Sequence, residues 1–168
     1  FYALIGEDLN IYGSNEFNLP QDDSLLFFNT IGKNYQLAPG DTIQITITGL
    51  SPSNENYQVM NDGTITLENV YPLNVNNLNL NQVRILVLDK IQLDDASAEV
   101  FVRLNNARLV TVQISGNVKS PRTIAVPAYT PLSRVIAYSG GISDSGSLRN
   151  ISLSQIGEKT QTVDFYNF

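Results

Sequence analysis

Hydrophobic and polar residues alternate along much of this chain, and the alternation predicts short strands. The clearest case is residues 42–48, where isoleucine occupies every second position and one face of the strand would be buried. The polar residues 51–56 are expected to form a loop. The same two-residue period predicts further strands over residues 57–60, 64–67, 70–75 and 99–104.

The hydrophobic period becomes helical after residue 79. Four aliphatic residues recur at helical spacing, which predicts a helix over residues 80–92. Asn79 precedes this helix and Gln82 lies three positions later, the pattern of a capping box. A short helix is also expected near residues 21–28, within an irregular lead-in over residues 1–33.

The chain after residue 106 predicts the order strand, strand, helix, strand, strand. Thr130 is expected to cap a helix that ends at Ser139, with Pro131 at the first helical position. A small sheet crossed by one helix buries such an order economically. The strands are expected over residues 109–115, 122–126, 151–155 and 160–165.

These elements predict an α+β protein with two small mixed β-sheet domains, each carrying one main helix. Asn105 and Asn106 mark the expected boundary, so the domains would span residues 34–105 and 106–168. Proline and glycine at the turns preset φ or permit positive φ. Asp41 is expected to cap its turn rather than act as a functional carboxylate. The residues assigned to turns and caps are Pro39, Gly40, Asp41, Asp62, Gly63, Gly116, Pro121, Gly140 and Gly141.

The composition excludes several kinds of chemistry. The chain of 168 residues contains no Cys and no His, so it cannot build a disulfide or a nucleophile activated by histidine. Asp94 and Asp95 could imitate the carboxylate pair of a glycosidase, but adjacent side chains usually point apart. No catalytic residue, metal or cofactor is expected. The longest aliphatic run is residues 85–88, far short of the ~20 residues that a membrane span needs. Because the chain starts at Phe1, we expect it to be a piece of a longer protein.

Charge differs between the two halves of the chain. Residues 1–99 carry 3 basic and 13 acidic side chains, whereas residues 100–168 carry 7 basic and 3 acidic ones. Two differently solvated surfaces would explain this difference. Alternatively, the basic half contacts an anionic ligand or the acidic half of a neighbouring copy. The basic residues are too dispersed to predict nucleic-acid binding.

Four residues near the predicted Gly/Ser-rich loop 140–147 are candidates for ligand binding. A tyrosine ring can stack on a sugar face, an arginine can pair with uronate or phosphate, and a serine can bond a sugar hydroxyl. Ordinary packing on the helix is the alternative for the tyrosine. The candidates are Arg134, Tyr138, Ser143 and Arg149.

Two sets of spaced residues carry a family resemblance. The first set is Tyr35, Leu37, Pro39, Gly40, Asp41, Ile43 and Ile45, followed by Val59, Asp62, Gly63 and Ile65. It resembles the polysaccharide export domain of Wza-type outer-membrane polysaccharide export proteins. The second set is Val112, Ile114, Gly116, Val118, Pro121, Ile124, Leu132, Gly140 and Gly141. It resembles the soluble ligand-binding β-grasp (SLBB) domain of the same proteins, and residues 146–151 and 164–168 look like the longer members with several SLBB domains.

The resemblance implies a non-enzymatic component of a capsule or exopolysaccharide export machine. It implies a periplasmic location at the outer membrane of a Gram-negative bacterium, and a polysaccharide, which can be anionic, as cargo. The full-length protein is expected to form a homo-oligomeric conduit and to contact an inner-membrane export partner. The alternative is a monomeric β-grasp module that binds a glycan or another small ligand.

Overall fold

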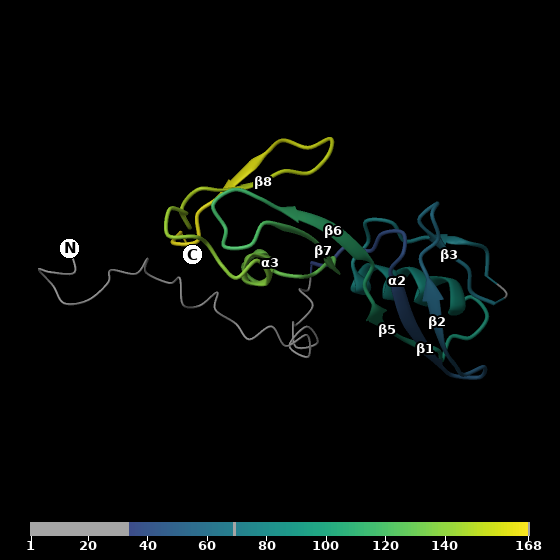
Figure 1. Ribbon diagram of the computed structural model, residues 1–168. Coiled ribbons are helices and arrows are strands. Elements are labelled where there is room, and N and C mark those ends of the chain that lie inside the picture. The colour runs from purple at the N-terminus through teal and green to yellow at the C-terminus, as the bar shows by residue number, and fades with distance from the viewer. Residues whose placement is uncertain (1–33, 69, 168) are drawn as a thin grey trace, which may run out of the picture. The chain divides into compact units, whose positions relative to one another are not determined.

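The computed structural model describes residues 34–68 and 70–167, so the helix predicted near residues 21–28 lies outside the described residues. The described chain divides into two compact units. We call residues 34–110 with 126–129 the N-terminal unit, and residues 111–125 with 130–167 the C-terminal unit. Each unit combines one helix with short strands, which confirms the α+β fold class (Figure 1).

A three-stranded antiparallel sheet forms the centre of the N-terminal unit. β1 (Thr42–Thr48) lies between β2 (Ser53–Gln58) and β5 (Glu99–Asn106). β1 confirms the predicted strand: Ile43 and Ile45 are fully buried, and Ile47 packs half-buried against the same core. β5 continues through the two asparagines at which the sequence predicted a domain boundary.

The loop predicted over residues 51–56 is wrong, because β2 occupies most of that segment. Backbone pairing with β1 forms this edge strand, and Glu55 lies opposite Ile45 in the register. The Thr46 hydroxyl also donates a hydrogen bond of 3.0 Å to Asn54 Oδ1 across the pair. An edge strand that faces solvent requires no hydrophobic alternation, so the period of the sequence did not reveal it.

A tight turn follows at residues 61–63, as the sequence predicted. The Gly63 N–H donates to Met60 O at 2.9 Å, and the Asp62 carboxylate accepts hydrogen bonds from the backbone and hydroxyl of Thr64. These bonds hold the pKa of Asp62 below its ordinary value. The strands nearby are shorter than predicted: β3 (Thr64–Ile65) and β4 (Leu73–Asn74) contribute two residues each and pair with each other.

Helix α2 (Leu80–Ile91) confirms the predicted helix and its capping box. The Asn79 side chain accepts from the Gln82 N–H at 2.9 Å, and the Gln82 side chain accepts from the Asn79 N–H at 2.9 Å. Val83 and Val87 are fully buried in the core that the helix shares with the three-stranded sheet (Figure 1).

Asp41 is the one charged side chain, within the described residues, that is completely buried. Its Oδ1 accepts hydrogen bonds from the Tyr35 hydroxyl at 2.8 Å and from the Arg108 backbone N–H at 2.7 Å. Its Oδ2 accepts from the Ala38 N–H at 2.9 Å and from Arg108 Nη1 at 3.0 Å. The predicted cap of the turn at Pro39 and Gly40 is therefore present, together with an ion pair that spans 67 residues.

The C-terminal unit contains most of β6 (Leu109–Ile114) and of β7 (Arg122–Pro127), which form a two-stranded sheet. Helix α3 (Leu132–Tyr138) follows, and then the hairpin of β8 (Ile151–Leu153) and β9 (Gln161–Val163). This order confirms the predicted sequence of elements. The small core of this unit contains Ile136, Ile142 and Leu148.

The predicted cap of α3 is wrong by one residue. Pro131, not Thr130, is the N-cap: its backbone is extended, and its carbonyl accepts hydrogen bonds from Arg134 and Val135. The Thr130 hydroxyl makes no capping bond and is buried without a partner. At the other end, Gly140 and Gly141 follow Ser139 with φ of +76° and +87°, a conformation that glycine adopts without strain. Pro121 directly precedes β7.

We expect Asp41→Asn to lower the free energy of unfolding of the N-terminal unit by about 3 kcal/mol, because the substitution leaves Arg108 without its buried partner. This value is the lower end of the usual cost of breaking a buried ion pair, because the Arg108 side chain is 32% exposed. Urea denaturation followed by far-UV circular dichroism measures the change. Asp89→Asn, which removes an exposed ion pair, is the control and should cost less than about 1 kcal/mol. Equal effects of the two substitutions would contradict the prediction.

The Tyr35 phenol should make stability fall at alkaline pH. Burial, and then the hydrogen bond and charge of Asp41, raise the pKa of Tyr35 above its ordinary value of 10.0. Above pH 10 the unfolded chain ionises this tyrosine, whereas the folded chain does not. The stability that Tyr35 contributes is therefore present below pH 10 and is lost as the pH rises. Tyr35→Phe should therefore flatten the alkaline loss of stability. The raised pKa of Tyr57 is shared by both proteins and cancels. Parallel stability curves would refute this assignment.

Candidate functional site

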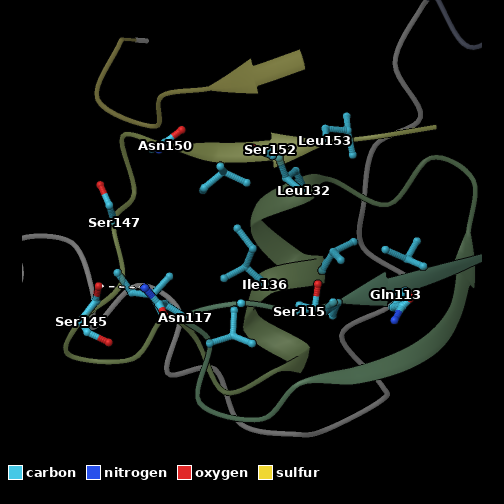
Figure 2. A pocket seen from close by; sticks show the side chains of 17 residues that line it. Gln113, Ser115, Asn117, Leu132, Ile136, Ser145, Ser147, Asn150, Ser152 and Leu153 are labelled. Carbon is cyan, nitrogen blue, oxygen red and sulfur yellow. Dashed lines mark hydrogen bonds between the residues drawn. The ribbon is translucent and has the colours of Figure 1, made fainter. Parts of the chain in front are cut away.

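The C-terminal unit contains a pocket of about 410 Å³. Helix α3 forms one wall with three aliphatic side chains, and Figure 2 shows β8 on one side of this helix and β6 on another. The turn after β6 and the loop before β8 complete the wall. The lining residues are Val112, Gln113, Ile114, Ser115, Gly116, Asn117, Val118, Leu132, Val135, Ile136, Ile142, Ser145, Ser147, Asn150, Ile151, Ser152 and Leu153.

Hydrogen bonds hold the loop over residues 142–147 against the turn after β6. Asn117 contributes twice: its carbonyl accepts from the Ser143 N–H at 3.0 Å, and its Nδ2 donates to Ser145 O at 3.1 Å (Figure 2). Val118 and Ile142 form an antiparallel bridge beside them. Gly146 is required at this contact, since a Cβ there would lie 2.6 Å from the carbonyl oxygen of Asn117.

The pocket borders the edges of two strands rather than the face of a sheet. Three consecutive residues of β6 (112–114) and three of β8 (151–153) line it, together with the turn over residues 115–118. Side chains in a strand alternate between two faces, so a pocket against one face would contact every second residue. Backbone N–H and C=O groups of these segments are therefore part of the wall.

The lining is uncharged. Seven lining residues carry an amide or hydroxyl side chain, the others are aliphatic or glycine, and none is aromatic. Such a surface can donate and accept neutral hydrogen bonds above an apolar floor. It offers neither a cation for a carboxylate nor a ring for stacking on a sugar.

The four residues predicted to bind a ligand do not line this pocket. Ser143 supports the loop through its N–H, and its hydroxyl lies 3.3 Å from that of Ser145. Arg149 is two-thirds exposed, pairs with Asp164 at 3.5 Å and lies 4.6 Å from the centre of the Tyr166 ring. Arg134 and Tyr138 are half-buried on α3.

A basic cluster lies at the C-terminal end of α3. Arg122 Nη1 donates to the carbonyl of Tyr138 at 3.0 Å. Lys119 lies beside Gly140, because its Cβ is 3.5 Å from the position that a Cβ on Gly140 would occupy. Arg134 precedes Tyr138 by about one helical turn, so it lies on the same side of α3. Helical spacing pointed to Arg134 and Tyr138, whereas only tertiary contacts bring Lys119 and Arg122 to the end of α3.

A second pocket, of about 390 Å³, lies in the N-terminal unit between the β1–β2 turn and the end of α2. Its acidic lining side chains include Asp95, whose pKa is lowered by hydrogen bonds from Ser97 and from the Leu50 N–H. Among residues 34–68 and 70–167, no cluster of His, Cys, Asp or Glu suits a metal ion. No helix in this part of the chain is long and apolar enough to cross a membrane.

Comparisons with known proteins define the class of each part of the chain. Residues 29–105 match the family model described as polysaccharide biosynthesis/export protein, and residues 111–164 match the SLBB domain. These matches have the order that the spaced sequence motifs predicted. The chain thus joins a segment similar to polysaccharide biosynthesis/export proteins to a segment similar to SLBB domains, as the resemblance to Wza-type export proteins implied.

Two curated relatives align with most of this chain. Both are named polysialic acid transport protein KpsD, from Escherichia coli, and each is 28% identical to this chain over 162 residues. The alignments cover 94% of this chain but 28% of each relative. The chain therefore spans little more than a quarter of the length of these relatives.

Gly146→Ala should displace the loop from the turn that borders the pocket, because the added Cβ would meet backbone oxygens of Asn117 and Ser143 at 2.6 and 3.0 Å. We expect a loss of about 1–3 kcal/mol in the free energy of unfolding. Amide NMR shifts should change in residues 115–118 and 142–147. Gly157→Ala is the comparison: its Cβ meets nothing within 4 Å, and its φ of +85° costs about 1–2 kcal/mol locally. Unchanged shifts at Asn117 in Gly146→Ala would contradict the prediction.

Proposed function

We propose that this chain is a structural, non-catalytic part of a machine that exports polysaccharide across the periplasm and outer membrane of a Gram-negative bacterium. The observation that carries the proposal is the order of the two family matches, an export domain over residues 29–105 and an SLBB domain over residues 111–164. The two relatives named for polysialic acid transport support the same role. In this role the chain guides and positions a polymer, and it breaks no bond.

The arrangement of the acidic residues favours a non-catalytic role. Asp41, the buried carboxylate, accepts four hydrogen bonds within the fold. The pocket of the C-terminal unit has no charged lining residue that could act as a general acid or base. Asp95 of the other pocket is engaged by the backbone of Leu50 and by Ser97. Each of these groups has a structural role that explains its position.

We further propose that the polymer is anionic and contacts the basic cluster at the end of α3. Lys119 and Arg122 lie at the C-terminal end of α3, and Arg134 lies about one helical turn before Tyr138 on the same helix. Dispersed cations hold a polyanion weakly and let it slide, which suits transport better than a tight pocket does. Ser143 and Arg149 of the predicted site stay outside this cluster as candidates.

The full-length protein, in this proposal, forms a homo-oligomeric conduit and meets an inner-membrane partner of the export pathway. The alternative function is a monomeric module that binds a glycan or small ligand. The neutral pocket of the C-terminal unit favours that alternative, because its seven amide or hydroxyl side chains could bond sugar hydroxyls.

Deleting the gene for the full-length protein should abolish surface polysaccharide while the cell continues to make the polymer. Immunoblots or uronic acid and sialic acid assays on surface and periplasmic fractions measure the two pools. We expect polymer to accumulate inside the cell, and the wild-type gene to restore export. Arg122→Ala with Arg134→Ala should reduce the surface pool several-fold if the cargo is anionic. The matched control is Arg84→Ala with Arg103→Ala in the N-terminal unit, and it should export normally.

Two results would overturn the proposal. Surface polymer that persists after deletion would exclude an export role, and loss of total polymer would indicate a role in synthesis. Saturable binding of a neutral oligosaccharide by the chain, lost in Asn117→Ala or Ser147→Ala, would favour the binding module instead.

A further inference from the structure

The pocket of the N-terminal unit is an apolar groove with an acidic rim. Four carboxylates line it against a single cation, Lys90. Leu50 stands at its edge with 81% of its surface exposed, although large aliphatic side chains usually gain by burial. We call this pocket the acidic groove. Its lining residues are Ile47, Leu50, Ser51, Pro52, Ser53, Glu55, Tyr57, Leu67, Glu68, Val70, Lys90, Ile91, Asp94 and Asp95.

The carboxylates of the acidic groove are unequally engaged. Asp95 accepts the Leu50 N–H at 2.7 Å, and Glu55 accepts the Tyr57 hydroxyl at 3.2 Å. Within the described part of the chain, the structure gives Glu68 and Asp94 no hydrogen bond or ion pair through their carboxylates. The groove can therefore receive a cation from outside without breaking an existing ion pair.

The C-terminal unit presents a projection with one exposed aliphatic side chain and one exposed cation, Lys159, which follows the carboxylate of Glu158. The hairpin of β8 and β9 ends in a tip over residues 154–160, where Ile156 is completely exposed. The tip has a defined shape: the Glu158 N–H donates to Gln155 O at 3.1 Å, and the Ser154 and Thr160 hydroxyls lie 2.9 Å apart. Lys159, also exposed, adds a cation three residues after the isoleucine. We call residues 154–160 the hairpin tip.

We propose that the hairpin tip of one copy docks into the acidic groove of a second copy. Ile156 would supply the apolar anchor beside Leu50, and Lys159 would meet the carboxylate of Asp94 or Glu68. An aliphatic anchor that fills a pocket with a polar rim is one arrangement that supports a binding interface. This inference rests on the homo-oligomer of the proposed function and names the surfaces that would build it.

The net charges of the two units also favour this pairing. Residues 34–110 of the N-terminal unit carry 8 acidic and 4 basic side chains, whereas residues 111–167 carry 3 acidic and 5 basic ones. Opposite net charges steer two copies toward a head-to-tail encounter, and they disfavour pairing of two acidic units. A contact between different surfaces of identical chains is heterologous, so it propagates into a ring or an open chain rather than stopping at two copies.

Cysteine cross-linking tests the contact directly, because the chain has no Cys of its own. Chains with Leu50→Cys, mixed with chains with Ile156→Cys under mild oxidation, should form a mixed disulfide dimer. A chain with both substitutions should form a ladder of covalent oligomers. The control pairs Ile156→Cys with Ile85→Cys, a position on α2 that is 52% exposed and lies outside the groove. A yield equal to this control, or Leu50→Cys chains that link only to each other, would overturn the proposal.

Sedimentation velocity over a concentration series, at low and at high salt, provides the second readout. Ile156→Ser should weaken self-association at least about tenfold, the usual effect of losing an interface anchor. Lys159→Glu should weaken it at low salt, and Asp94→Lys in the same chain should restore it. Ile85→Ser is the control, and circular dichroism verifies that each variant is folded. If the chain stays monomeric throughout and forms no selective disulfide, the proposed contact is wrong.

The gene-deletion experiment separates this inference from the proposed function. If deletion abolishes export but the selective disulfide is absent, then the function stands and the docking surfaces are wrong. If deletion leaves export intact, then the function fails whatever the disulfide shows. Loss of both self-association and export in Ile156→Ser would support the two proposals together.

Discussion

The N-terminal unit depends most on the hydrogen bonds and ion pair that the buried carboxylate of Asp41 makes. Its two oxygens accept four hydrogen bonds, from Tyr35, from the Ala38 backbone and twice from Arg108. The backbone of Asp41 adds a fifth link, because its carbonyl accepts the Val59 N–H at 2.8 Å. The Asp41 side chain thus holds the turn before β1 to the start of β6. The bond from the Val59 N–H joins the segment after β2 to the same residue. Removing a charge from water costs several kcal/mol, and only this complete set of donors makes the burial tolerable.

The two units offer different surfaces to a polymer or a partner. The pocket of the C-terminal unit is neutral and bordered by strand edges, and none of the cations of that unit lines it. The groove of the N-terminal unit is acidic. This separation suits a protein whose proposed task is assembly and guidance. Electrostatic attraction over a wide surface can hold a long polyanion without the deep complementary site that would trap it.

Local sequence determined every element whose stability comes from its own residues. The isoleucine alternation of β1, the capping box of α2 and the turn at Gly63 are local, and the structure confirms all three. β2 escaped prediction because an exposed edge strand owes its conformation to pairing with β1. The predicted cap of α3 was one residue too early. Thr130 before Pro131 fits the usual pattern of a helix cap, but Pro131 is the N-cap and the helix begins at Leu132.

The candidate sites needed tertiary structure, because they join residues that are distant in the chain. The sequence pointed to the family resemblance and to the Gly/Ser-rich loop. It did not show that Asn117 would hold this loop, or that no charged side chain would line the pocket. Asp41 was correctly assigned to a turn, yet its ion pair with Arg108 spans 67 residues and leaves no periodic signal. The sequence by itself thus determined most of the elements, the order of those elements and the family resemblance. The fold alone decided which polar groups meet, since contact across long loops depends on packing rather than on local spacing.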